Sequence, residues 1–269
     1  MTKMYFMSQQ SRFSAKLAII AGTTSLFLSY FAPPGLAQWN GGNYRPTGSV
    51  GTPTRTQSGA TRGPGVCPLA ETTLPLVAVV PNNTFGVTVK SHPTFVFHLP
   101  TIAQGATSPL VEFVIRDLDD NDIYKARFTT NGSGGIASIT LPENSGVQGL
   151  ELDKDYKWSV AIICQMNDRG KDLVTEGIIQ RISVPAELSP NILGNKSPLE
   201  QAELLANASI WYDAVALMVE TQRTNPSLSQ WGGLLQAVGL RDFIGQPLLS
   251  SGNTLIPLDT SSTSSSLPD

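Results

Sequence analysis

Apolar and polar residues alternate along much of the stretch from residue 69 to residue 185, in short runs that turn residues separate. In the run 110–116, Val111, Phe113 and Ile115 fall on one face of an extended chain, and charged residues fall on the other. The runs 93–99, 123–129, 137–141 and 156–164 show the same alternation, 74–80 is a compact apolar run, and 174–184 is a less regular strand. A period of two predicts strands with one buried face. About seven or eight such strands, with no helical pattern between them, predict a β-sandwich over residues 67–190 and not a parallel sheet.

The stretch "GLELDKDYKWSVAIIC" (149–164) indicates which kind of sandwich to expect. Leu150 precedes a polar turn, and Tyr156 then opens an apolar strand in which Trp158 faces the core. This order resembles the tyrosine corner of immunoglobulin-like and fibronectin-like domains. We therefore expect an immunoglobulin/fibronectin-like β-sandwich.

The hydrophobic period changes to that of a helix in the C-terminal part of the chain. Ser197 and Glu200 have the spacing of a capping box, with Pro198 at the first helical position. The following residues, about 199–223, are apolar around most of a helix circumference, and a shorter helix is expected at about 229–238. The fold class is thus mainly β, with an α-helical hairpin in residues 191–250 that packs on the sandwich or on a partner.

Three large aromatic residues lie on this predicted hairpin, namely Trp211, Tyr212 and Trp231. We predict that they form an interaction surface. The alternative is that they belong to the core of the hairpin, and the pattern alone leaves both open.

The N-terminal residues 1–37 have the features of a secretory signal. Lys3, Arg12 and Lys16 precede an apolar stretch, and the segment ends in Gly35-Leu36-Ala37. This order predicts cleavage before Gln38 and export to the periplasm or the medium. The apolar core is shorter than the roughly 20 residues that a spanning helix needs, so an uncleaved membrane anchor is the less favoured reading.

Two further segments have the composition of disordered chain. Residues 38–66 are rich in Gly, Pro and Thr and contain three arginines but no acid, which predicts a linker that is either a tether or an arm for a polyanion. Residues 251–269 form a Ser/Thr-rich tail. Removal of the signal leaves 15 of the 18 basic residues and all 21 acidic ones, a net charge of −6. Such a chain is a poor ligand for nucleic acid.

The chain has two cysteines, Cys67 and Cys164. An even count in an exported protein predicts one disulfide, while two buried free thiols are the alternative. Cys164 ends an apolar run, where a thiolate is disfavoured, so neither cysteine is expected to act as a nucleophile.

Both histidines lie in the stretch "HPTFVFHLP". His92 and His98 share a face of the predicted strand but are six residues apart, which is roughly 20 Å at about 3.3 Å per residue. They are therefore too far apart to bind one metal ion or to act as a catalytic pair, and we expect structural roles for both.

The stretch "RDLDDNDIY" crowds carboxylates into one loop and raises the question of calcium. A calcium-binding EF-hand loop has Gly at its sixth position and Glu at its twelfth, whereas counting from Asp117 gives Asp122 and Phe128. We therefore expect an acidic β-turn, with weak calcium binding as the alternative. Motifs for a cofactor, a metal or a catalytic nucleophile are absent from the sequence, so no such residues are predicted.

Several stretches, taken in their order along the chain, resemble those of a known family. His-Pro-Thr-Phe at 92–95, Tyr156-x-Trp158 with the downstream Cys164, and Trp-Tyr-Asp-Ala at 211–214 are its specific parts. With "LVAVVP", "VEFVIRD" and "WGGLLQAVGL", they resemble a cyanobacterial family of exported proteins catalogued as domain of unknown function 928, from about residue 74 to 248. His98 and Gln165 depart from the expected pattern. The resemblance supports architecture and export, and it implies no functional residue.

Two functions compete on these observations. The first is a non-catalytic binding module of the cell envelope whose partner is an envelope protein or a glycan. The second is a carboxylate-dependent hydrolase of envelope polysaccharide that draws its acid and base from the cluster at residues 117–122. A structural envelope protein, or an accessory factor in assembly or secretion of another protein, is the remaining alternative.

Overall fold

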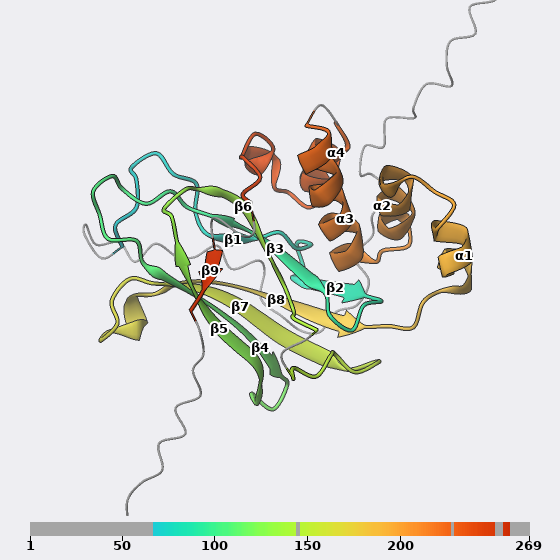
Figure 1. Ribbon diagram of the computed structural model, residues 1–269, viewed down its shortest axis with the longest axis horizontal. Helices are drawn as coiled ribbons and strands as arrows, with labels where there is room; N and C mark the ends of the chain where they lie inside the picture. The colour runs from blue at the N-terminus through green and yellow to red at the C-terminus, as the bar shows by residue number, and fades with distance from the viewer. Residues whose placement is uncertain (1–66, 144–145, 227–228, 251–254, 259–269) are drawn as a thin grey trace, which may run out of the picture. The chain divides into compact units, whose positions relative to one another are not determined.

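The computed structural model describes residues 67–143, 146–226, 229–250 and 255–258 (Figure 1). Its strands are β1 (Val77–Ala78), β2 (Phe85–Thr88), β3 (Thr94–Leu99), β4 (Leu110–Asp117), β5 (Asp122–Thr130), β6 (Gly135–Thr140), β7 (Asp155–Ile163), β8 (Leu173–Arg181) and β9 (Leu255–Pro257). Its α-helices are α1 (Pro190–Leu193), α2 (Pro198–Asn207), α3 (Trp211–Thr224) and α4 (Gln230–Ala237). Short 3-10 turns lie at η1 (Arg169–Lys171), η2 (Ala186–Leu188) and η3 (Arg241–Phe243). The predicted signal (1–37) and linker (38–66) lie outside the described residues.

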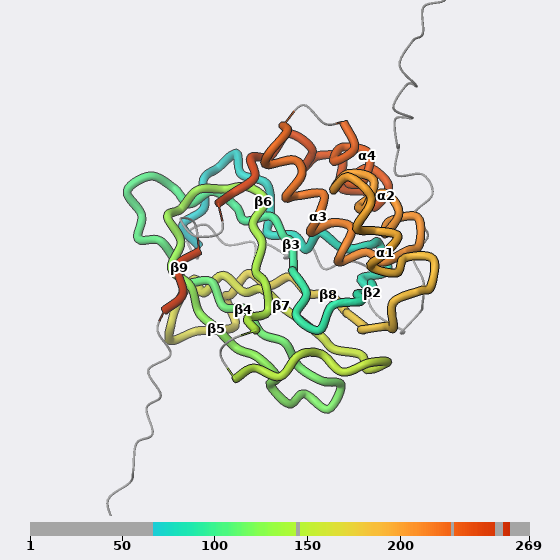
Figure 2. Tube along the Cα trace, turned by 45° about the vertical axis from the view of Figure 1, so that its right-hand side comes forward, coloured from blue at the N-terminus to red at the C-terminus, as the bar shows by residue number. Residues whose placement is uncertain are grey.

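The strands form two sheets. The smaller has the order β1-β3-β6, and the larger has the order β2-β8-β7-β4-β5-β9. Neighbouring strands are antiparallel except β2, which pairs with β8 in parallel. Figures 1 and 2 show the two sheets as separate layers, with the helices gathered on one side of β3 and β2. Within the described ranges, no helix is long and apolar enough to cross a membrane.

The two sheets face each other across an aromatic core. The predicted inward residues of β4, Val111, Phe113 and Ile115, are all fully buried. The ring of Phe95 in β3 lies 5.0 Å from that of Phe113 and 5.1 Å from that of Trp158 in β7. Contacts of this kind between rings contribute beyond the burial of apolar area. The inward face predicted for β4 is therefore confirmed, whereas the prediction of a single buried face is wrong for β3 and β4, which are buried on both faces over most of their length.

The predicted tyrosine corner has its defining hydrogen bond. The hydroxyl of Tyr156 accepts from the backbone N–H of Glu151 at 3.1 Å, and the ring itself is buried. A mainly β fold with helices in the C-terminal part is confirmed. The immunoglobulin-like identity of the sandwich stays a prediction, because the larger sheet includes a parallel strand pair.

The predicted helical hairpin is wrong in detail. The expected long helix is two helices, α2 and α3, and the short α1 precedes them. The capping box of Ser197 and Glu200 is present at the start of α2, as predicted. Helix α2 then ends because Ser209 adopts a left-handed conformation (φ 63°). The N–H groups of Ser209 and Ile210 bond back to the carbonyls of Ala206 and Leu205, the pattern of a Schellman motif.

Two strands were not predicted. The edge strand β2 follows the turn at residues 82–84 and is too short to show a clear period. Strand β9 lies inside the predicted disordered tail (251–269), so that prediction is corrected at Leu255–Pro257. Leu255 pairs with Thr130 of β5 and is buried, which explains why this segment is ordered.

Candidate functional site

The three aromatic residues that were predicted as an interaction surface are buried. Trp211, Tyr212 and Trp231 are 0%, 1% and 2% exposed. The indole N–H of Trp211 donates to the carbonyl of Val79 (2.9 Å), and the hydroxyl of Tyr212 donates to the carbonyl of Ile178 in β8 (3.0 Å). These side chains therefore anchor α3 to both sheets. The predicted interaction surface is therefore wrong, and the alternative that these side chains belong to the core is correct. The reason is that the first turn of α3 packs against strands that lie far away in the sequence.

The two histidines have separate structural environments. His98 in β3 is buried, with Nδ1 2.8 Å from the Pro75 carbonyl and Nε2 3.2 Å from the side-chain oxygen of Gln246. Burial lowers the pKa of His98, although these two hydrogen bonds oppose the shift. His92 precedes β3 and contacts the hydroxyl of Ser91. Among the described residues, no group of three or more His, Cys, Asp or Glu side chains is placed to hold a metal ion.

The acidic stretch at 117–122 is a turn between β4 and β5, as predicted. The carboxylate of Asp117 accepts hydrogen bonds from the backbone N–H groups of Asp119 and Asn121 and from the side chain of Asn121. The side-chain and backbone hydrogen bonds of Asn121 lower the pKa of Asp117. Asp120 occupies a left-handed position (φ 64°). The carboxylate of Asp117, at the end of β4, therefore caps the turn that follows it.

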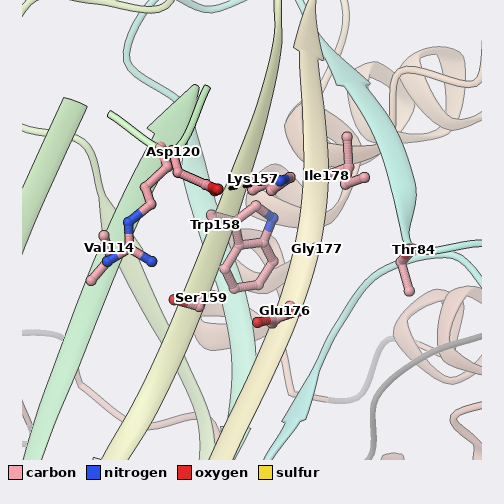
Figure 3. A pocket seen from close by; sticks show the side chains of 10 residues that line it. Thr84, Val114, Asp120, Lys157, Trp158, Ser159, Glu176, Gly177 and Ile178 are labelled. Atoms are coloured by element: carbon pink, nitrogen blue, oxygen red, sulfur yellow. Dashed lines mark hydrogen bonds and ion pairs between the residues drawn. The ribbon is translucent and has the colours of Figure 1, made fainter. Parts of the chain in front are cut away.

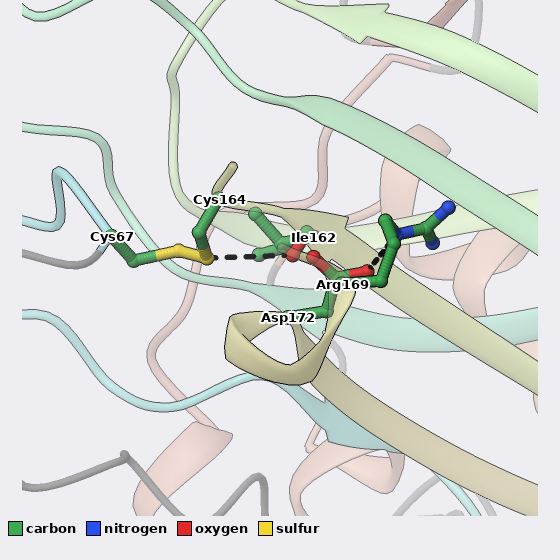
Figure 4. Close-up of a disulfide and its surroundings, with 5 residues drawn as sticks. All are labelled: Cys67, Ile162, Cys164, Arg169 and Asp172. Carbon is green, nitrogen blue, oxygen red and sulfur yellow. Dashed lines mark hydrogen bonds and ion pairs between the residues drawn. A yellow bond between two sulfur atoms is a disulfide. The ribbon is translucent and has the colours of Figure 1, made fainter. Parts of the chain in front are cut away.

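The predicted disulfide between Cys67 and Cys164 is confirmed, with the two Cα atoms 4.8 Å apart (Figure 4). It joins the start of the described chain to the end of β7.

The segment after Cys164 is held by ion pairs to Glu112, a buried carboxylate in β4. The guanidinium of Arg169 lies 2.9 Å from this carboxylate, and that of Arg127 lies 2.8 Å from it. Burial favours a higher pKa for Glu112, but the hydrogen bonds from Arg169 and Arg127 outweigh it and lower the pKa. This cluster is structural, since its groups pair with one another.

The outer face of the larger sheet has a hollow of about 310 Å³ (Figure 3). The strand register places Arg116, Lys157 and Ile178 in one row across β4, β7 and β8. A second row contains Val114, Ser159 and Glu176. Asp120 from the acidic turn reaches Lys157 across the hollow, at 3.4 Å. The hollow is thus lined by one predicted carboxylate, Asp120, and by a second one, Glu176, that sequence reasoning had not selected.

A larger groove, of about 470 Å³, lies between the helices and the smaller sheet. Its floor includes Thr94 and Val96 of β3 and Thr140 of β6, and its helical wall includes Asp213 and Leu217 of α3. Lys90, Glu220 and Arg223 add charge around it. Asp213 lies on the first turn of α3, directly after the two aromatic anchors, so the same packing that buries Trp211 and Tyr212 places this carboxylate in the groove wall.

The environment of Asp213 is unusual for a carboxylate. The side chain is only 4% exposed. Its Oδ2 accepts from the hydroxyl of Thr88 (2.7 Å) and from the backbone N–H of Val89 (3.1 Å), whereas its Oδ1 is buried without a hydrogen-bond partner. Burial raises the pKa of Asp213, against the hydrogen bond from Thr88 and the charge of Lys90. Buried polar atoms are nearly always paired in folded proteins, so Oδ1 requires an explanation.

Asp213 can do two things chemically. Its Oδ2 has a structural role, because its hydrogen bonds with Thr88 and Val89 connect the end of β2 to α3. Its Oδ1 offers an acceptor, or a donor when the group is protonated, to a molecule in the groove. Sequence reasoning missed this residue because a single acid on a helix that is apolar around most of its circumference belongs to no recognised motif. An acid directly after two residues of the apolar face was the available signal.

The family of the chain is now clear. A model of the family described as Domain of Unknown Function (DUF928) matches residues 57–248, which is more than half of the 269-residue chain. The chain belongs to this family. The matched region contains the disulfide, both sheets except β9, the four helices and the Asp213 groove. No curated protein matches the chain. The predicted cyanobacterial source stays a prediction.

Proposed function

We propose that this DUF928 protein is an exported, non-catalytic binding module of the cell envelope, and that the Asp213 groove holds a segment of a partner protein. The single observation that carries the proposal is Asp213 itself. Its Oδ1 is buried, lacks a partner and lies in the wall of a groove that also offers apolar and hydroxyl side chains. Binding sites commonly combine an apolar lining with a few convergent polar groups.

Export is the part of the proposal that rests on sequence alone. The basic and apolar segments of residues 1–37 support it, and a disulfide is most stable in an oxidising compartment. N-terminal sequencing of the protein recovered outside the cytoplasm should begin at Gln38. Recovery of the whole chain from the cytoplasm, with its cysteines reduced, would overturn this part.

The binding role is tested by crosslinking in cells. The C-terminally tagged full chain is crosslinked in its own cells and purified, and its partners are identified by mass spectrometry. The parent is compared with Asp213→Asn, in which the side-chain oxygen still accepts from Thr88 and the NH₂ group replaces the unpaired Oδ1. Asp119→Asn, in the exposed acidic turn, is the matched control.

We expect one dominant envelope protein with the parent and with Asp119→Asn, and its loss with Asp213→Asn. Both variants should retain the circular dichroism spectrum of the parent. An unchanged set of partners with folded Asp213→Asn would refute the groove as the binding site.

A hydrolase acting on envelope polysaccharide is the second candidate. It is supported by the outer hollow of the larger sheet, where Asp120 and Glu176 both lie. Glycoside hydrolysis requires two carboxylates that flank the scissile bond. Purified protein without its signal is incubated with envelope polysaccharide, and products are followed beside Asp120→Asn and Glu176→Gln. Turnover that these variants lose would favour the enzyme, and no turnover by the parent would exclude this candidate.

A further inference from the structure

The outer face of the larger sheet carries buried apolar side chains in and beside the hollow shown in Figure 3. Val114 in β4 and Ile178 in β8 line this hollow and are both 5% exposed. On β7, Ala161 and Ile163 lie on the same face, toward the end of the strand, and are also buried. The described α-helices pack against β2 and β3, so they do not account for this burial. An apolar strip of this kind is expected where another part of the chain covers a sheet.

Glu176 is the acid of this face that remains without a cation. The acids near the end of β7, which are Glu112, Asp168 and Asp172, all form ion pairs. Asp120, inside the hollow, pairs with a lysine at 3.4 Å. Glu176 is exposed in the hollow and forms no ion pair among the described residues. A cation that reaches the hollow therefore finds one carboxylate that is not already paired.

The segment directly before Cys67 can supply this cation. Residues 57–66 belong to the region that the family model matches, although they lie outside the described residues. Their one charged side chain is Arg62, and three of these ten residues are glycine, which lets a backbone approach a surface closely. The disulfide fixes the end of this segment beside the end of β7, because the Cα atoms of Cys67 and Cys164 are 4.8 Å apart.

The lengths of the two chain segments match. Ser159, which pairs with Glu176 in the strand register, is five residues before Cys164, and this is about 16 Å at about 3.3 Å per residue. Arg62 is also five residues before its cysteine, and an extended segment of that length again spans about 16 Å. A short tether keeps its end at an effective concentration of the order of millimolar, so a weak contact is enough to hold it.

We propose that residues 57–66 lie over the outer face of the larger sheet, from the disulfide to the hollow, with Arg62 paired to Glu176. The occupant is the segment of the same chain, because the disulfide holds its end at the required distance. The inference does not depend on the Asp213 groove, which lies at the smaller sheet. A hollow covered in this way is closed to a polysaccharide, so this proposal and the hydrolase exclude each other.

Zero-length crosslinking tests the proposal. The full chain with Arg62→Lys is produced in its own cells, purified with its disulfide intact and treated with a carbodiimide, which joins an amine to a carboxylate in contact with it. The joined peptides are sequenced by mass spectrometry. Arg55→Lys, before the matched region, is the control variant. The pair of Lys157 and Asp120 reports in both variants that the reagent reaches the hollow.

We expect the amine at position 62 to be joined to Glu176, in a product with the mass of one chain. This link should form at least about tenfold more often than a link from position 55, whereas tether length alone gives a free chain only about fourfold. A ratio near fourfold would overturn the proposal, as would a link to a different carboxylate or no link beside that of Lys157 and Asp120. A product with the mass of two chains would assign the face to a second copy and overturn the placement within one chain.

Discussion

The indole N–H of Trp158 in β7 donates to the hydroxyl of Tyr212 in α3 at 2.7 Å, across 54 residues of sequence. The same hydroxyl donates to the Ile178 carbonyl in β8, so one oxygen joins the helix to two strands of the larger sheet. The neighbouring Trp211 bonds to the carbonyl of Val79, beside the smaller sheet. The first turn of α3 thus links both sheets, and the carboxylate of Asp213 follows directly.

Replacement of Tyr212 by Phe should weaken this junction without removing the ring from the core. The variant leaves the buried N–H of Trp158 without its acceptor, which costs about 1–3 kcal/mol in the free energy of unfolding. Chemical denaturation of the variant and the parent measures the difference. Tyr156→Phe is the control, because that hydroxyl accepts one N–H at a turn and its loss should cost about 0.5–1.5 kcal/mol. Equal stability of Tyr212→Phe and the parent would contradict the role given to this oxygen.

Gly177 in β8 leaves room for the Trp158 ring. A Cβ atom at this position would lie 2.6 Å from Nε1 of Trp158, closer than such atoms approach. Gly177→Ala should therefore lower the free energy of unfolding by about 1–3 kcal/mol, as overpacking of a core does. Gly245→Ala, whose added Cβ meets nothing within 4 Å, should change it by less than about 0.5 kcal/mol. A harmless Gly177→Ala would show that the indole is free to move.

The disulfide should contribute to stability and should be complete in the exported protein. It closes a loop with a sequence separation of 97 residues. The double variant Cys67→Ser, Cys164→Ser should lose about 2–4 kcal/mol of unfolding free energy. Alkylation of the unreduced protein, followed by intact mass, should show no added label. Free thiols in the exported protein would contradict the pairing.

The raised pKa of Asp213 predicts a stability that depends on pH. The folded protein retains the Asp213 proton to higher pH than the unfolded chain does. This contribution is complete below the unfolded pKa of about 3.9, and it is lost as pH rises through the folded pKa. The neutral Asp213→Asn variant should therefore gain stability relative to the parent as pH rises through that range. Denaturation curves from pH 3 to 8 measure the difference, and parallel curves for the two proteins would argue against a raised pKa.

The lowered pKa of His98 predicts that the protein loses stability as pH falls, which is the opposite of the effect of Asp213. Its pKa is lowered in the folded state, so the unfolded chain takes up a proton at a higher pH than the folded protein. Stability is then complete above the ordinary pKa of about 6.5 and declines as pH falls toward the folded pKa. His98→Gln, which cannot titrate, should show a flatter profile between pH 7 and 5. Equal slopes for the variant and the parent would place the acid sensitivity elsewhere.

Several features of this protein were determined by the sequence itself. The alternating runs predicted most strands of both sheets, the spacing of Ser197 and Glu200 predicted the start of α2, and the cysteine count predicted the disulfide. The order of Leu150, turn and Tyr156 predicted a hydrogen bond that the structure contains. These are local signals, because backbone geometry sets the period of a strand and caps act within a few residues.

Only the tertiary structure decided the candidate site. The helical period continues through Ser209, yet the helix ends there and a new one begins, so that Trp211 and Tyr212 meet both sheets. Periodicity shows which residues share a face, but the surface that covers this face comes from distant segments. The same holds for β9, whose Leu255 is ordered by pairing with β5, and for Asp213. Its burial and unpaired oxygen arise from the packing of α3 against the chain after β2, which no local pattern of residues contains.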